Sequence, residues 1–224
     1  MSVQNQIRTG RRAFNRADNR AAILQAARQV FAELGFGGAT VRDIIRRTKL
    51  ATGTFYNYFD SKESVFSALN DEIGTELRAK LAEARNAAST FEQFVENSFY
   101  TYFSYYADNP DSYWLIRSNR GRGGHNSVMP GPQVQAGLEE MRKDIEAAMA
   151  EGVVPQLDID FLNASLGGVA FAVLDEMMER QTIDPQAAAR FASRLIMAGV
   201  DGFENAPDAM GAMGASINST TDTC

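Results

Sequence analysis

The chain has 224 residues, of which 45% are hydrophobic and 10% aromatic, and its formal net charge is −6. These values are typical of a soluble globular protein with a hydrophobic core. The one cysteine, Cys224, cannot form a disulfide within the chain, which favours a reducing, cytoplasmic location.

The charge is unevenly divided along the chain. Residues 1–62 contain eleven Lys/Arg and four Asp/Glu, a net charge of +7, whereas the other residues contain eleven and 24, a net charge of −13. This asymmetry predicts a basic module for a polyanion and an acidic body with another role. Chance clustering of solvated charges is the alternative.

The N-terminal segment, residues 1–17, is polar and rich in arginine, and we expect a flexible basic arm. It lacks the apolar stretch of a secretory signal. The arm suits contacts with an adjacent minor groove or with phosphates, and a solvated tail with only diffuse attraction is an equally good interpretation. Its arginines are Arg8, Arg11, Arg12 and Arg16.

Three helices are predicted after the arm. From Arg20, apolar residues recur with a period of 3.6 and predict an amphipathic helix that ends at the glycines at 35, 37 and 38. Thr40, with Asp43 three residues later, predicts a capped helix over 41–48. A brief connection leads to a helix over 52–59. The last two helices have the helix-turn-helix layout, whose second helix enters the DNA major groove.

The aromatic residues of the stretch 52–59 are predicted to divide between two faces. Phe55 and Phe59 are four residues apart, so they share a helix face, which we assign to the core. Tyr56 and Tyr58 lie outside that face, where their hydroxyls suit phosphate oxygens. Ordinary amphipathic packing of the tyrosines is the alternative.

The rest of the chain predicts helices and no strands, because no stretch alternates with period two. The predicted cap pairs are Asp60 with Glu63, then Ser89 with Glu92 or Thr90 with Gln93, and the Asn109-Pro110 and Asp184-Pro185 dipeptides. The predicted helices cover about 61–83, a segment ending near 107, then 110–120, 133–151, 158–181 and 185–202.

Glycine and proline dominate residues 121–132, which predicts a loop, and residues 204–224 have the composition of a disordered tail. The longest mostly apolar run, 161–174, is too short to span a bilayer, so we interpret it as a buried helix and expect no membrane segment. The expected fold is all-α, with about nine helices.

The stretch from Ala22 to Phe66, AILQAARQVFAELGFGGATVRDIIRRTKLATGTFYNYFDSKESVF, resembles the DNA-binding domain of the tetracycline-repressor (TetR) family. The resemblance includes T-V-R-D-I, G-T-F-Y-N-Y-F and S-K-E. It implies a helix-turn-helix domain over 18–66, an effector-binding and dimerisation domain over 67–203, a homodimer and a palindromic operator.

The same resemblance implies the DNA contacts. Thr40 is similar to a phosphate-contacting residue at the start of the second helix, and Lys62 to a lysine that meets phosphate at the start of the fourth. The implied DNA-binding residues are Thr40, Arg42, Thr52, Gly53, Thr54, Tyr56, Asn57, Tyr58 and Lys62.

Two positions depart from the commonest family pattern. Lys49 replaces a glycine of the turn, and a non-glycine residue with positive φ costs roughly 1 kcal/mol. Ala51 replaces a serine at the cap position, where losing a cap costs about 1 kcal/mol. We therefore expect faster amide exchange at 52–56 than in the first helix.

The acidic body is expected to bind an effector and a second copy. The helices near 158–181 and 185–202 are predicted to form a four-helix dimer interface, and an interior hairpin of a monomer is the alternative. Their apolar face comprises Leu162, Leu166, Val169, Val173, Met177, Phe191, Leu195 and Ile196, with small residues at Gly167, Gly168, Ala170 and Ala172 for close approach.

An aromatic stretch followed by arginines suits an effector with an apolar tail and an anionic head, because guanidinium pairs with carboxylate or phosphate. It weakly resembles the fatty-acid and acyl-CoA-responsive branch of the family. Core aromatics with arginines at a helix end are an equal alternative, and an aromatic or drug-like effector stays open. The candidates are Phe99, Tyr102, Phe103, Tyr106, Tyr113, Trp114, Arg117 and Arg120.

The predicted function is a ligand-responsive DNA-binding regulator, expected to be a repressor released from its operator by an effector. We expect no catalytic residue, cofactor or metal, since the one histidine, His125, lies in a glycine-rich segment. The alternatives are an effector-independent architectural DNA-binding protein, and a small-molecule binding protein or enzyme whose basic end serves other anions.

Overall fold

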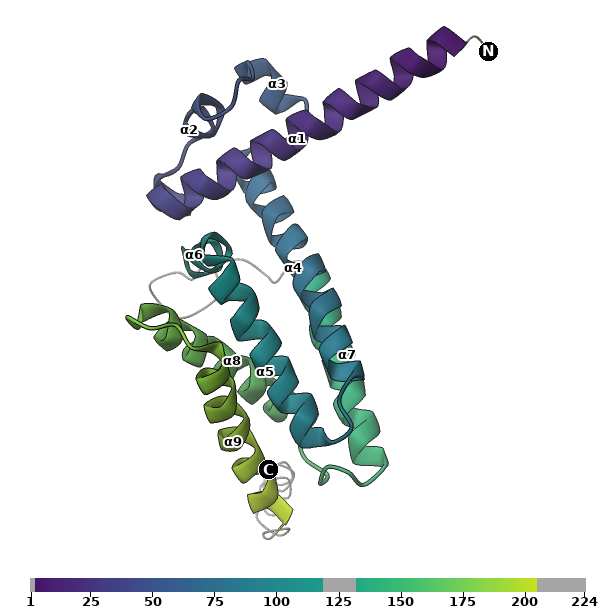
Figure 1. The fold of residues 1–224 in the computed structure, drawn as a ribbon, viewed down its shortest axis with the longest axis vertical. Helices are drawn as coiled ribbons and strands as arrows, with labels where there is room; N and C mark the ends of the chain where they lie inside the picture. Colours follow the sequence, from purple (N-terminus) through teal and green to yellow (C-terminus); the bar gives the residue numbers. More distant parts are fainter. Residues whose placement is uncertain (1–2, 119–131, 205–224) are drawn as a thin grey trace, which may run out of the picture. The chain divides into compact units, whose positions relative to one another are not determined.

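The structure, a computed structural model, describes residues 3–118 and 132–204, with side chains over 17–117 and 132–203. All regular structure in these ranges is helical, which confirms the all-α prediction (Figure 1). The loop and tail predicted over 121–132 and 204–224 lie almost entirely outside the described residues. The helices are α1 (Val3–Gly38), α2 (Val41–Arg46), α3 (Thr52–Tyr56), α4 (Lys62–Asn86), α5 (Phe91–Asp108), α6 (Pro110–Ser118), α7 (Pro132–Ala150), α8 (Ile159–Glu179) and α9 (Pro185–Glu204).

The chain divides into two compact units. The first comprises Met1–Lys80 and Tyr105–Gly137, and the second comprises Leu81–Ser104 and Leu138–Cys224. Helices α4, α5 and α7 therefore each contribute residues to both units. The functional division predicted at residue 66 stays a prediction.

Aromatic side chains fill the core of the first unit. The Phe31 ring lies 5.6 Å from the rings of Phe36 and Phe66, centroid to centroid, and the last two are 4.7 Å apart. Ile44 of α2 and Phe55 of α3 have no exposed surface. Since burying a large apolar side chain contributes about 1.5–3 kcal/mol, this core fixes where α2 and α3 lie against α1.

Helix α1 begins earlier than the sequence pattern predicts. Its backbone is helical from Val3, not from Arg20. The preceding residues have no apolar period but are compatible with a helix, and only Gly10 carries the cost of about 1 kcal/mol that glycine imposes. At the other end the backbone leaves the helical conformation at Gly35, with φ 68° and ψ 159°. The role of residues 1–17 as a binding arm stays a prediction.

Capping residues start several helices where the sequence predicts. The Thr40–Asp43 capping box is confirmed, because the Asp43 backbone N–H donates to the Thr40 hydroxyl and the Thr40 N–H donates to the Asp43 carboxylate. Of the two candidate caps for α5, Thr90 accepts from the Gln93 N–H at 3.2 Å. Helices α6 and α9 begin at the two predicted prolines.

The predicted cap of α4, Asp60 with Glu63, is wrong by one residue. The backbone N–H groups of Ser61 and Ser64 each donate to the other's hydroxyl at 3.2 Å. Serine hydroxyls are good acceptors for the free N–H groups of a helix start, so Ser61 takes the place predicted for Asp60.

In the second unit, α8 and α9 pack against each other, with Leu162 and Leu174 of α8 and Ile196 of α9 buried. Arg85, in the last turn of α4, is also buried. Its guanidinium lies 2.9 Å from the Asp144 carboxylate and 3.7 Å from that of Glu140. A buried cation needs such partners, so this ion pair fixes the end of α4 against α7.

Helix α8 is long and apolar enough to cross a membrane by length and composition, and no other helix within 3–118 or 132–204 is. Only 22% of its most apolar window is buried. The prediction of a buried helix over 161–174 is therefore wrong for the single chain, because small residues and Phe161 line an uncovered face. Interface helices of soluble proteins have the same composition, so we assign no membrane segment.

Candidate nucleic-acid interface

Helices α2 and α3 form the predicted helix-turn-helix, and two buried phenylalanines anchor it. Phe55 and Phe59 are buried as predicted, with ring centroids 6.0 Å apart. Helix α3 ends at Tyr56, so it is shorter than the predicted 52–59, and the chain turns after it. At its start, Ala51 makes no side-chain cap. The position of this short helix therefore depends on its two buried rings.

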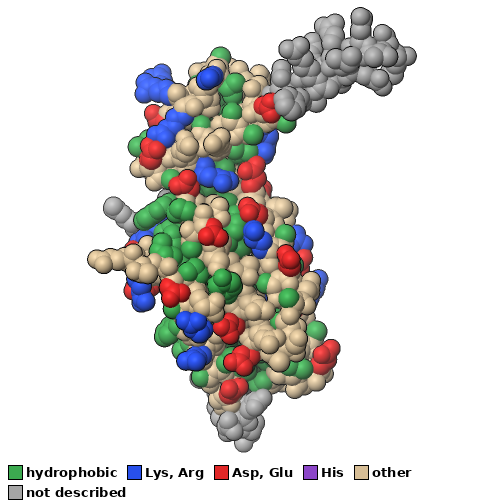
Figure 2. All heavy atoms as spheres, in the orientation of Figure 1, with side chains coloured by type: hydrophobic (Ala, Val, Ile, Leu, Met, Phe, Trp, Pro, Cys, Tyr) green, Lys and Arg blue, Asp and Glu red, His purple; other side chains and the backbone are tan. Residues whose placement is uncertain are grey.

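The outer side of this segment is polar. Thr52, Gly53 and Asn57 are exposed, Thr54 is half-buried, and the Tyr56 side chain is 55% exposed. A methyl group added at Gly53 meets no protein atom within 4 Å. Figure 2 shows lysine and arginine side chains on the part of the surface formed by α2 and α3. The space above Gly53 is therefore open to a partner.

Helix α2 contributes further polar groups. Thr40 and Arg42 are exposed. The hydrogen bond from Thr40 lowers the pKa of the Asp43 carboxyl, with Arg46 and Arg42 contributing. Arg46 is also exposed, one turn after Arg42, and the sequence prediction omitted it. The sequence signal for Arg46 is its i,i+4 spacing from Arg42, which places both arginines on one face of the helix.

Arg47 holds the end of α2 against α1. Its guanidinium donates two hydrogen bonds to the Glu33 carboxylate, one of them at 2.6 Å. This pair lowers the pKa of Glu33 and raises that of Arg47. Arg47 is therefore a positioning residue for the helix-turn-helix rather than a free cation.

Lys62 has an internal role that the sequence did not predict. Its ammonium donates to the carbonyl oxygens of Phe36 at 2.9 Å and Ala39 at 3.0 Å, and it lies 4.7 Å from the Phe36 ring centroid. Lys62 thus closes the connection between α1 and α2. An ammonium has three donors, so the predicted phosphate contact is compatible with this arrangement and stays a prediction.

The two tyrosines differ in their surroundings. Tyr56 is exposed, whereas Tyr58 is half-buried and its hydroxyl accepts a hydrogen bond from the Asn19 side-chain amide at 3.4 Å. The Arg20 guanidinium of α1 lies 5.5 Å from the Phe59 ring centroid. Residues 19 and 20 of α1 therefore lie beside the end of the helix-turn-helix.

The predicted effector residues fall in both units, and their role stays a prediction. Phe99, Tyr102 and Phe103 belong to the second unit, where the two phenylalanine rings stack 5.8 Å apart. Tyr106, Tyr113, Trp114 and Arg117 belong to the first unit, and Arg120 lies outside the described residues.

Within the first unit, α6 brings three of these residues together. The Arg117 guanidinium donates to the Tyr113 hydroxyl at 2.7 Å and lies 5.3 Å from the Trp114 ring centroid. Tyr113 is fully buried, whereas Trp114 is largely exposed. Nearby in sequence, burial and the Glu76 carboxylate raise the pKa of Tyr105 to about 12. This cluster places the Arg117 guanidinium and the Tyr113 hydroxyl beside the Trp114 ring.

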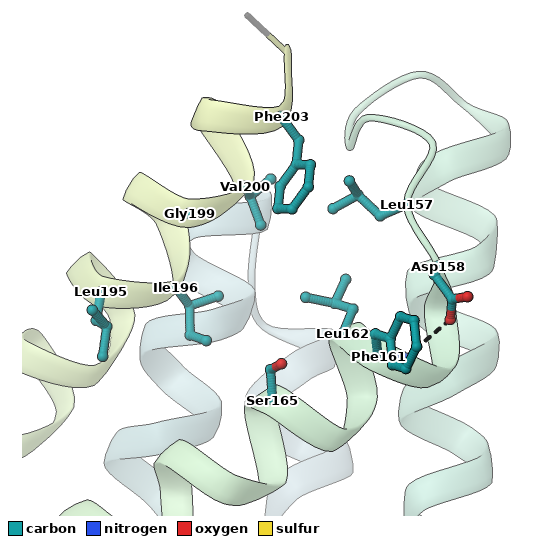
Figure 3. A pocket seen from close by; sticks show the side chains of 10 residues that line it. All are labelled: Leu157, Asp158, Phe161, Leu162, Ser165, Leu195, Ile196, Gly199, Val200 and Phe203. Atoms are coloured by element: carbon teal, nitrogen blue, oxygen red, sulfur yellow. Dashed lines mark hydrogen bonds between the residues drawn. The ribbon is translucent and has the colours of Figure 1, made fainter. Parts of the chain in front are cut away.

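A cavity of about 180 Å³ lies elsewhere, between α8 and α9. Figure 3 shows Phe161, Leu162, Ile196 and Phe203 around it, with the Phe161 N–H donating to the Asp158 carboxylate at 3.0 Å. None of its lining residues is in the predicted effector set. Of the predicted dimer face, Leu162, Leu166, Met177 and Ile196 are already buried within the unit, whereas Phe191 and Leu195 are exposed.

Known proteins match this chain in its N-terminal part. Residues 23–69 match the family model described as bacterial regulatory proteins, tetR family. The match covers 47 of the 224 residues, so it relates this segment, and not the whole chain, to the TetR family. The HTH-type transcriptional repressor Rv3405c of Mycobacterium tuberculosis is 36% identical over 76 residues, which is 34% of this chain and 40% of that protein. The aligned part of the chain thus spans 40% of the length of the curated relatives that it matches.

Solved structures align with most of this chain. The transcriptional regulator FadR from Bacillus subtilis, in complex with stearoyl-CoA, aligns with a TM-score of 0.68 at 19% identity and covers 80% of this chain and 98% of that one. A putative tetR family regulator from Shewanella sp. PV-4 aligns with a TM-score of 0.66 at 21% identity, over 81% and 97% of the two chains. At these identities the likeness shows the fold alone.

Proposed function

We propose that this chain is a ligand-responsive repressor that binds a palindromic operator as a homodimer and is released by a small effector. The observation that carries the proposal is the exposed polar surface of α2 and α3, held in place by buried phenylalanines. The family match of residues 23–69 supports it.

The proposed DNA contacts divide by chemistry. Thr40, Arg42, Tyr56, Tyr58 and Lys62 offer donors to phosphate oxygens, which fix position. We assign base recognition to Thr52, Gly53, Thr54 and Asn57. The short side chains of this group, and their absence at Gly53, suit close approach in the major groove.

Gly53 gives the sharpest test of this surface. Replacing it with alanine adds a methyl group into open space, and glycine is about 1 kcal/mol worse than alanine in a helix. The Gly53→Ala variant is therefore expected to be at least as stable as wild type. Its operator affinity is expected to fall by about tenfold or more, because the methyl group occupies the space of a base edge.

The probe for this test is a duplex selected from a random library by the wild-type protein, with affinity measured by fluorescence anisotropy. The matched control is Gly152→Asn, at a glycine with φ 72° in the second unit, where asparagine tolerates the same conformation. Equal affinity of Gly53→Ala and wild type would remove α3 from the interface.

We propose that the uncovered faces of α8 and α9 form the dimer interface. Support comes from Phe161, Phe191 and Leu195, which are 67%, 61% and 52% exposed in one chain. Methyl groups added at Gly168 and Gly199 meet no atom within 4 Å, so packing within the chain does not require glycine at these two positions. A second copy would cover this surface, including the cavity between α8 and α9.

We propose that the effector has an apolar tail and an anionic head, as in a fatty acid or acyl-CoA. Arg117, beside Tyr113 and Trp114, supplies the cationic partner. The FadR structure with stearoyl-CoA supports this class. Effector binding would change the spacing of the two recognition helices in the dimer, and α4, which contributes to both units, is the proposed link.

Native mass spectrometry of the purified protein, alone and with stearoyl-CoA, palmitate or a neutral aromatic compound, tests the effector class. The proposal predicts that an anionic lipid binds, releases the operator, and does both more weakly in Arg117→Gln. Operator release by the neutral aromatic compound alone would favour a drug-like effector. No response to any of them would favour an effector-independent DNA-binding protein.

A further inference from the structure

Helix α9 carries a row of exposed residues at every fourth position. Phe191, Leu195 and Phe203 are 61%, 52% and 45% exposed, and the small residues of the row, Ala187 and Gly199, are exposed as well. Residues four apart form a ridge on a helix, and such ridges are the rows along which helices pack on each other. The row therefore has the form of a packing surface that is open to solvent in the single chain.

The order of large and small residues in this row is complementary to its own reverse. In a dimer with two-fold symmetry, a contact from residue i to residue j of the partner is repeated from j to i. When two α9 helices run antiparallel with the symmetry axis at Leu195, Phe191 lies opposite the partner's Gly199. By the same symmetry, Phe203 lies opposite the partner's Ala187. Each phenylalanine of the row thus meets a small residue, and Leu195 meets its own copy.

The charges of α9 favour the same antiparallel orientation. Arg190 and Arg194 precede Leu195, whereas Asp201 follows it, and all three charged residues are exposed. Reversal about Leu195 brings Arg190 within one residue of the partner's Asp201. A parallel pair would instead place each arginine beside its own copy, and like charges that face each other weaken an interface.

The cavity between α8 and α9 borders the glycine of this row. Gly199 lines it together with Leu162 and Ile196 (Figure 3), and a methyl group added at Gly199 meets no atom within 4 Å. The cavity volume is about 180 Å³, and an apolar cavity of roughly 150 Å³ accommodates a benzene ring. A phenyl ring from a second chain therefore fits this cavity.

We propose that two α9 helices pack antiparallel about Leu195, and that the Phe191 ring of each protomer enters the partner's cavity beside Gly199. The inference rests on the proposed homodimer and deepens it, because it assigns the orientation of the helices and the occupant of the cavity. The site is incomplete in one chain, since the ring that fills it comes from the second copy. Phe191 and Gly199 are then the residues that decide which second chain fits.

Disulfide cross-linking tests the orientation. In a Cys224→Ser background with oxidised glutathione, Leu195→Cys is expected to cross-link the dimer, because a disulfide needs Cα atoms about 4.4–6.8 Å apart. The matched control is Ala187→Cys, an exposed position of the same row. Eight residues at 1.5 Å place it about 12 Å from the axis, so its two copies lie roughly 24 Å apart. Equal cross-linking of the two variants, or none in Leu195→Cys, would overturn the arrangement.

The dimer dissociation constant tests the ring and its cavity. Phe191→Ala removes the ring and Gly199→Leu fills its place, and both positions are exposed, so the protomers are expected to keep their melting temperature. Each variant should raise the dissociation constant by about 30-fold or more in sedimentation velocity, as for a buried aromatic anchor. The double variant should raise it no further than the larger single effect, since both changes remove one contact. Additive effects would place Phe191 outside the cavity.

Sedimentation and operator binding of the wild-type protein test the proposed function separately. A dimer that binds its operator but lacks the Leu195→Cys cross-link would overturn this arrangement and leave the proposed function intact. A wild-type protein that stays monomeric would overturn both.

Discussion

The helix pairs α2–α3 and α8–α9 bury apolar residues in the same way but expose different chemistry. The first pair is anchored by Ile44 and Phe55 and presents hydroxyl, amide and guanidinium groups. The second buries Leu174 and Ile196 and presents Phe161 and glycines. Their buried faces decide where the helices lie. Their outer faces differ in the partner that we propose for them, which is phosphate for one pair and the same surface of a second copy for the other.

The largest expected effect comes from removing the anchor of the first pair. Phe55→Ala empties a fully buried site, which costs about 3–5 kcal/mol. We expect a lower melting temperature together with loss of operator binding. The neighbouring Tyr56→Ala changes an exposed residue and is expected to lose binding with little loss of stability. Similar melting temperatures for the two variants would contradict the division between buried and outer faces.

The next effect concerns the outer face of the second pair. Leu195→Glu places a charge on an exposed apolar surface, so it is expected to leave the protomer folded. If this surface is the dimer interface, the dimer dissociation constant should rise by about 30-fold or more. Sedimentation velocity measures the change, with Leu138→Glu on α7 as the control at another exposed leucine. Equal dissociation constants for the two variants would place the interface elsewhere.

A smaller effect is expected at the start of α3. Ala51 makes no cap, and Ala51→Ser supplies a hydroxyl for the free N–H groups, which is worth about 1 kcal/mol. We expect slower amide exchange at residues 52–56 in the variant, and in wild type faster exchange there than in the core part of α1. Unchanged exchange in Ala51→Ser would mean that the buried rings alone determine the order of this helix.

The smallest effect is the pH dependence of the α2 cap. The Thr40 hydrogen bond holds the pKa of Asp43 below its ordinary value. The ionised Asp43 carboxylate therefore contributes to stability above the ordinary aspartate pKa of about 3.9. This contribution is lost as the pH falls through the lower pKa of Asp43 in the folded state. Asp43→Asn should show a weaker loss of stability than wild type between pH 5 and pH 2.5 by thermal unfolding. Parallel curves would remove Asp43 as a contributor.

Local patterns predicted the parts of the fold that depend on local chemistry. The i,i+4 spacing of Phe55 and Phe59 was sufficient to identify the core face of the helix-turn-helix, and the Thr40 cap followed from residue types three positions apart. The same reasoning from residue types chose the wrong cap for α4, where two candidate caps, Asp60 and Ser61, are adjacent. Aspartate and serine are both favoured caps, so residue type alone does not choose between these neighbours, and the structure uses Ser61.

Other features depend on contacts between residues that are far apart in the sequence, which a local pattern does not predict. The Lys62 ammonium meets carbonyl groups more than twenty residues away, at the end of α1. The start of α1 has no apolar period, so only helix propensity supports it. Aromatic composition could not separate the buried stack of Phe99 and Phe103 from the cluster around Arg117. The effector set predicted from composition therefore contains residues of both kinds, and its role stays a prediction.

The proposal that this chain binds a palindromic operator as a homodimer is tested by the stoichiometry and symmetry of its DNA complex. Hydroxyl-radical footprinting and native mass spectrometry of the wild-type protein on its selected duplex measure both. We expect a short palindromic footprint that is occupied by one homodimer, with two symmetric half-sites. Uniform protection along the DNA, or one protomer on an asymmetric site, would contradict it.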